Sequence, residues 1–133
     1  MNIFQAADIL HFERYRFTDD GSVARHFALV LLPSSVVGYE NSLYCAVITS
    51  KEDKQYSLKL EKNKYSCFSR DSFACFRRRD IESISDLSEN KQPLEKLNKA
   101  DIKNAFKVIK SVLYRAGDAY MTATVIREWK TMR

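Results

Sequence analysis

Histidine, cysteine, glycine and proline are all scarce in this chain of 133 residues, and the shortages exclude several classes of protein. The chain has three glycines, two prolines, three cysteines and two histidines. Cys45, Cys67 and Cys75 are odd in number and none lies in a CxxC pair, which argues against a disulfide framework and against a zinc site. We therefore expect free thiols, buried at Cys45 and Cys75, a reducing compartment, and neither metal nor cofactor.

Long apolar stretches and targeting signals are also missing. No apolar run approaches the ~20 residues that a membrane-spanning helix needs, and the N-terminal residues lack the basic and apolar regions of a signal peptide. These features predict a cytoplasmic protein without membrane attachment. The sequence has no glycine-rich phosphate loop and no nucleophile elbow, so no motif supports an enzyme acting on small molecules.

What the chain does have is an ordinary globular composition with a modest basic excess. It is 45% hydrophobic and 29% charged, with a net charge of +5. The length predicts one domain, 1–133, that is large enough to bury a core. The charge permits binding to nucleic acid or another polyanion but does not require it.

Five short segments have the residue patterns of β-strands. Alternating or continuous apolar residues mark them, and polar segments separate them. The predicted strands are 9–17, 26–33, 43–50, 55–61 and 72–84. Between the first two, the Asp20-Gly21 pair in segment 18–25 is a strong turn signal. We expect 34–42 and 86–97 to be loops.

The pattern changes to a helical one after the strands. Asn98 is a suitable N-cap, and apolar residues then recur at spacings of three and four as far as Gly117, a suitable C-terminal cap. Their positions are Ile102, Phe106, Ile109 and Leu113, with Lys103, Lys107 and Lys110 on the outer face. Asp118 can cap a second helix, whose apolar stripe we expect to pack on the strands or on a dimer mate. This stripe consists of Met121, Val125, Trp129 and Met132.

The order of elements predicts an α+β fold. Strands fill 8–87 and helices fill 98–133, so a small antiparallel barrel or curled sheet with C-terminal helices is the natural arrangement.

Three stretches of the sequence resemble one protein family. They are "RHFALVLLP" (25–33), "YCAVITSK" (44–51) and "DSFACFRRRDIESISDL" (71–87). Together with the closing helix, they are similar to the MazF/PemK family of bacterial toxins from toxin–antitoxin modules, over roughly residues 8–114. The resemblance implies an SH3-like barrel, usually a homodimer, that cleaves single-stranded RNA without metal and is inhibited by an antitoxin protein.

The resemblance also implies which residues carry the chemistry. In the family, a threonine or serine at the end of the third strand and an arginine in the first loop meet at the scissile phosphate, and cleavage leaves a 2′,3′-cyclic phosphate. The hydroxyl falls on Thr49, with Ser50 beside it. The arginine falls on His26, with Arg25 beside it, so either residue can take that place. A histidine there is also suited to acid–base work.

Other basic residues are candidates for contacts with the RNA backbone. These are Arg77, Arg79, Lys51 and Lys54. The family's fifth strand carries an aspartate followed by an arginine three residues later, whereas this chain has the opposite order in Arg77 and Asp80. That exchange leaves open a second hypothesis, a non-catalytic barrel that binds nucleic acid or protein. His11, in the middle of the first strand, fits a polar outer-face residue better than a catalyst.

Overall fold

The structure is a computed structural model that describes residues 4–17, 20–37, 41–88, 92–113 and 119–132. Its strands are β1 (Asp8–Arg16), β2 (Val23–Leu32), β3 (Ser42–Thr49), β4 (Ser57–Leu60), β5 (Ser72–Ser83) and β6 (Glu95–Lys96). Its helices are α1 (Ser34–Val37), the 3₁₀ helix η1 (Ile84–Asp86), α2 (Lys99–Leu113) and α3 (Ala119–Met132).

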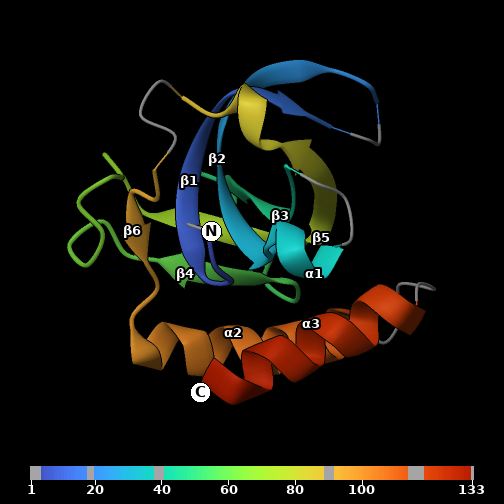
Figure 1. The fold of residues 1–133 in the computed structure, drawn as a ribbon. Coiled ribbons are helices and arrows are strands. Elements are labelled where there is room, and N and C mark those ends of the chain that lie inside the picture. The colour runs from blue at the N-terminus through green and yellow to red at the C-terminus, as the bar shows by residue number, and fades with distance from the viewer. Residues whose placement is uncertain (1–3, 18–19, 38–40, 89–91, 114–118, 133) are drawn as a thin grey trace.

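The six strands form one antiparallel sheet that curls into a half-barrel. Their order across the sheet is β4-β5-β3-β2-β1-β6. Both C-terminal helices lie against one face of this sheet (Figure 1). The predicted α+β fold, a small antiparallel barrel followed by C-terminal helices, is therefore confirmed in the form of a half-barrel.

Apolar side chains are buried on both faces of the sheet, which explains the continuous apolar run in β2. Leu29 and Leu31 belong to the core between the sheet and the helices, whereas Ala28 and Val30 belong to the core inside the curl of the sheet. Successive residues of a strand point to opposite faces, so a strand covered on both sides has no polar alternation. The inner core is closed across the curl by Tyr15, whose hydroxyl donates a 2.7 Å hydrogen bond to the Asp80 carboxylate.

Helix α2 begins as the sequence predicts. The side chain of Asn98 accepts a 2.8 Å hydrogen bond from the backbone N–H of Asp101, and Ile102, Phe106 and Ile109 are buried. The three lysines of the predicted outer face are exposed. Gly117, Asp118 and the side chain of Leu113 lie outside the described residues.

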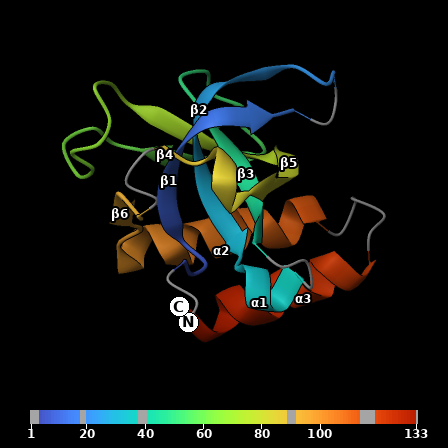
Figure 2. The same ribbon diagram turned by 45° about the horizontal axis from the view of Figure 1, so that its top comes forward.

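Helix α3 runs beside α2 under the sheet (Figure 2). Val125 and Trp129 are fully buried and Met132 packs against the same core, so the prediction that this stripe packs on the strands is confirmed. The side chain of Met121 lies outside the described residues.

Among the helices described, none combines the length and the apolar character needed to cross a bilayer.

Three predicted loops were partly wrong, because one overlaps the start of β2 and two contain elements too short to show a period. Segment 18–25 is shorter than expected, since Val23 and Ala24 already pair with β1 beyond a turn in which Gly21 has φ of 73°. Segment 34–42 contains α1. Segment 86–97 contains β6, which pairs with the start of β1 and adds a sixth strand to the predicted five.

Candidate functional site

An open pocket of about 370 Å³ lies where β3 ends beside β1 and β2. This volume falls within the range of about 300–1,000 Å³ that is typical of small-ligand sites. The pocket is lined by β1, β2, the end of β3 and the segment that leads into β5. Its polar lining residues are His11, Arg25, His26, Thr49, Ser50, Ser69, Arg70 and Ser72.

The pocket exists because β2 extends beyond its partner β3. The pairing of β2 with β3 stops at Phe27 and Ile48, one residue before β3 ends at Thr49. The preceding part of β2 pairs with β1 alone among the described residues. This leaves an uncovered strand edge from which side chains of both faces are accessible.

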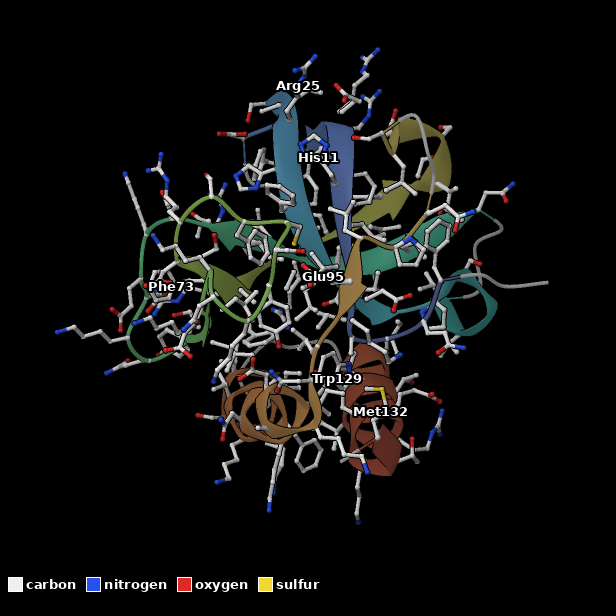
Figure 3. The ribbon with its side chains drawn as sticks, turned by 90° about the vertical axis from the view of Figure 1, so that its left-hand side faces the viewer. His11, Arg25, Phe73, Glu95, Trp129 and Met132 are labelled. Carbon is white, nitrogen blue, oxygen red and sulfur yellow. The ribbon has the colours of Figure 1, made fainter. Side chains whose placement is uncertain are left out.

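The uncovered edge explains how both histidines reach one pocket. His11 pairs with Phe27, whereas His26 pairs with Phe12. Cross-strand partners share a face and neighbouring residues alternate, so the two histidines start from opposite faces of the β1–β2 ribbon. Figure 3 shows His11 and Arg25 at the same end of this ribbon, well away from Trp129 and the helices.

Aromatic rings support the pocket from below. Phe27 lies between His11 and Phe68, with ring centroids 4.9 Å and 5.1 Å apart and the rings edge to face. Phe68 is buried and precedes Ser69 and Arg70, so its packing fixes the wall that these two residues form. The same segment is tied down by the Asp71 carboxylate, which accepts a 2.9 Å hydrogen bond from the backbone N–H of Lys62.

The charge of the pocket suits an anion. Arg25 and Arg70 both line it, and among the described lining residues there is no aspartate or glutamate. Arg25 is largely exposed and forms a 2.8 Å ion pair with Glu13, which lies just outside the lining. Two guanidinium groups and several hydroxyls around one cavity suit the charge and the hydrogen-bond acceptors of a phosphate.

Hydrogen bonds hold the Thr49 hydroxyl and both imidazole rings of the pocket. The Thr49 hydroxyl oxygen accepts a 3.3 Å hydrogen bond from the backbone N–H of Lys51, which leaves the hydroxyl proton available to another acceptor. Nδ1 of His26 lies 3.2 Å from the carbonyl oxygen of Phe27 and donates to it, since a carbonyl cannot donate. Nδ1 of His11 is hydrogen-bonded to the hydroxyl of Ser88.

The structure brings together the four residues predicted to act at the phosphate. Thr49, Ser50, Arg25 and His26 all line the pocket. Their meeting could be expected from the resemblance, because each lies at or near the matching ends of neighbouring strands.

The four predicted RNA-backbone contacts do not line the pocket. The guanidinium of Arg77 stacks 3.9 Å above the Tyr56 ring and pairs with Asp53 at 3.5 Å. Arg79 is partly buried on β5, and its Nε finds no hydrogen-bond partner among the described residues. The remaining two, Lys51 and Lys54, are exposed in the segment that follows β3.

Sequence reasoning missed His11, Arg70 and the two serines on the same wall, Ser69 and Ser72. His11 was expected on the outer face, and no pattern marks a functional arginine in a loop. The useful signal was the scarcity of histidine. The chain has only two histidines, and one lies on each strand of the β1–β2 hairpin. Antiparallel pairing offsets them by a single residue, since His11 pairs with the residue next to His26.

A second polar cluster lies inside the curl, next to the pocket. The ring of Tyr15 contacts the ring of His26, with centroids 6.1 Å apart, and its hydroxyl bonds to Asp80. Glu82 accepts a 2.6 Å hydrogen bond from the backbone N–H of Arg16, and burial, aided by the nearby carboxylate of Asp80, raises the pKa of Glu82 to about 7. Burial likewise raises the pKa of Tyr15. Asp80 is thus a buried structural residue on this side of the strand.

Metal-ligating groups are dispersed in the described part of the chain, where no three His, Cys, Asp or Glu side chains gather as a metal site would require. The pocket donors are imidazole, guanidinium and hydroxyl groups, of which only the imidazoles are good metal ligands.

Comparison of the sequence with known proteins gives no matching family model and no significant match to a curated protein.

Proposed function

We propose that this pocket cleaves single-stranded RNA by transesterification, with protein side chains alone supplying the acid, the base and the positive charge. One observation carries the proposal. Both histidines of the chain, two arginines and the hydroxyls of Thr49 and Ser50 line the same cavity. RNA cleavage of this kind needs only one proton acceptor, one proton donor and cationic support for the phosphate oxygens.

In the proposed reaction, Nε2 of one histidine accepts the proton of the ribose 2′-hydroxyl. The 2′-oxygen forms a bond to the adjacent phosphorus, and the bond from phosphorus to the 5′-oxygen breaks. The other histidine, protonated at the start, gives its proton to the departing 5′-oxygen. The products are a 2′,3′-cyclic phosphate and a 5′-hydroxyl, and neither water nor an oxidant is consumed.

The remaining polar groups have complementary tasks in this proposal. Arg25 and Arg70 bind the non-bridging phosphate oxygens, whose negative charge grows in the transition state. The Thr49 hydroxyl donates to the same oxygens, while its own oxygen is held by the Lys51 N–H. Lys51 and Lys54, exposed in the segment that follows Ser50, would bind flanking phosphates in this proposal.

We extend the proposal to a toxin-like protein of the MazF/PemK type, inhibited by an antitoxin that covers the pocket, and acting as a homodimer. The support for this extension is the sequence resemblance together with the half-barrel fold. Growth arrest on expression without a partner, relieved by the double change Thr49→Ala and Arg25→Ala, is the expected behaviour.

The decisive experiment incubates the purified protein with single-stranded RNA in the presence of a chelator and identifies the product ends. We expect a 2′,3′-cyclic phosphate and a 5′-hydroxyl, and a loss of about 10²–10⁴-fold in rate for His26→Ala. Lys103→Ala, on the exposed face of α2, is the matched control and retains full activity. Intact RNA would refute the proposal, and RNA that is bound but not cleaved would favour a non-catalytic binding module.

A further inference from the structure

A chain of polar contacts leads from the pocket to a carboxylate outside it. Nδ1 of His11 is hydrogen-bonded to the Ser88 hydroxyl, and this hydroxyl lies 3.3 Å from a carboxylate oxygen of Glu13. The backbone N–H of Ser88 also donates a 3.0 Å hydrogen bond to the carbonyl oxygen of His11, which fixes the serine beside the ring. The other oxygen of Glu13 pairs with Arg25.

The direction of each hydrogen bond in this chain follows from counting protons. The Ser88 hydroxyl has a single proton, and an ionised carboxylate only accepts. The hydroxyl proton therefore goes to Glu13, so the serine oxygen accepts from His11 and Nδ1 of His11 must carry a proton. In the neutral ring, Nε2 is then the unprotonated nitrogen.

We propose that Ser88 and Glu13 are positioning residues that hold His11 in the Nδ1–H tautomer and present its Nε2 as the general base of the pocket. This inference rests on the proposed RNA cleavage for its catalytic part. The tautomer itself stands on the hydrogen-bond geometry alone. Neither Ser88 nor Glu13 lines the pocket, and Ser88 acts on it only through His11.

The contacts of the two histidines divide their roles. When Nε2 of His11 takes a proton, the ring becomes a cation that is linked through Ser88 to the Glu13 carboxylate, which stabilises the positive charge. For His26, the partner of Nδ1 within the described part of the chain is the neutral carbonyl of Phe27. His11 is therefore assigned as the base that accepts the 2′-hydroxyl proton, and His26 as the acid that protonates the 5′-oxygen.

Arg25 completes the arrangement by binding the far side of Glu13. This ion pair, at 2.8 Å, places the carboxylate between the arginine and the serine. The proposed phosphate contact of Arg25 and its ion pair with Glu13 can use different N–H groups of one guanidinium, which has five.

The test measures the tautomer directly, by ¹⁵N chemical shifts of the His11 ring at about pH 8.5, well above the ordinary histidine pKa of about 6.5. In the wild-type protein we expect a protonated Nδ1 and an unprotonated Nε2. Ser88→Ala should shift the population towards the Nε2–H form, whereas Ser88→Thr, which keeps the hydroxyl, should restore the wild-type spectrum. Ser85→Ala, three residues earlier on the same segment, is the matched control and should leave the spectrum unchanged.

Kinetics give the second measurement. We expect Ser88→Ala to lower kcat for RNA cleavage by at least about tenfold and to leave KM unchanged. The loss should be smaller than the ~10²–10⁴-fold that removal of the general base itself costs. Ser88→Thr should recover most of the rate. Glu13→Gln should fall between Ser88→Ala and wild type.

The outcomes separate this inference from the proposed function. An Nε2–H tautomer in the wild-type protein overturns the positioning role, even if RNA is cleaved and even if Ser88→Ala fails to fold. A wild-type Nδ1–H tautomer that Ser88→Ala leaves unaltered overturns it as well. The expected tautomers with uncleaved RNA would support the hydrogen-bond chain and refute the nuclease.

Discussion

The indole N–H of Trp129 donates a 3.0 Å hydrogen bond to the backbone carbonyl of Leu31, which joins α3 to the middle of the sheet. Both groups are buried, so neither can exchange its partner for water without a cost. The contact links residues 98 positions apart and anchors the last helix at the strand that also carries His26.

Trp129→Phe should lower the free energy of unfolding by about 1–3 kcal/mol, because it leaves the buried carbonyl of Leu31 without its donor. Urea denaturation measures this change. Lys130→Ala alters the exposed neighbour and should stay within about 0.5 kcal/mol of wild type. Equal stability of Trp129→Phe and wild type would show that the indole N–H contributes nothing.

Glu82 should make the protein less stable as the pH rises. Burial raises its pKa from 4.5 to about 7 in the folded state, so the folded protein holds this proton more tightly than the unfolded chain. The contribution is fully favourable below about pH 4.5 and is lost as the pH rises through about 7. Urea midpoints at a series of pH values measure the slope.

Glu82→Gln should flatten that slope between pH 4.5 and 7, because the amide stays neutral and its oxygen can still accept from the N–H of Arg16. Glu52→Gln, at an exposed position, is the control and should keep the wild-type slope. A slope that survives in Glu82→Gln would assign the pH dependence to other groups.

Removal of the hydroxyl at Thr49 should slow RNA cleavage by about 10²–10³-fold, the typical loss when one donor to a transition-state oxyanion is removed. Thr49→Val tests this because it keeps the branched shape that ends β3. Thr49→Ser retains the hydroxyl and should stay close to wild type. Similar rates for Val and Ser at this position would exclude a role for the hydroxyl.

Arg70 and Arg77 should differ in their effect on RNA binding. Arg70 lines the pocket, whereas the guanidinium of Arg77 is already stacked on Tyr56 and paired with Asp53. Arg70→Ala should weaken binding and reduce the slope of log K against log salt by about 0.7, the value for one single-strand phosphate contact. Arg77→Ala should change the slope less, and the reverse order would move the RNA path onto β5.

The three thiols should react slowly in the folded protein. Cys45 is fully buried, and burial raises its pKa well above the ordinary value. Burial, aided by Glu95, raises the pKa of the partly buried Cys67 to about 12. Reaction with a disulfide reagent at pH 7.5 should be slow in buffer and rapid in denaturant, and a fast native thiol would contradict the packing.

The long elements were predictable because each repeats a pattern over enough residues. The apolar period after Asn98 identified α2, and the uninterrupted run in β2 identified a strand covered on both faces. β6 has two residues and α1 has four, so neither is long enough to show a period. β6 depends on the start of β1, which becomes its neighbour only in the folded chain, whereas α1 is a single turn closed on the carbonyl of the adjacent Pro33.

The candidate site was predictable in part, for a similar reason. Thr49 ends β3, and His26 lies one residue beyond the last pair between β2 and β3, so the predicted strand order was enough to bring them together. Arg70 reaches the pocket through a loop whose path is set by the packing of Phe68 on Phe27. Ser88 reaches His11 only because the segment after η1 folds back along β1, which no local pattern encodes.

The wall formed by Ser69 and Arg70 lies outside the hairpin that carries the histidines and meets it through the packing of Phe68 on Phe27. Its position is set by one buried ring, Phe68, and by the hydrogen bond from the backbone N–H of Lys62 to the Asp71 carboxylate. Substitutions at Ser69 and Arg70 can therefore change the shape and charge of the cavity while the hairpin with His11 and His26 stays intact. In the proposed nuclease, this wall is the natural place to alter the choice of nucleotide without changing the two histidines.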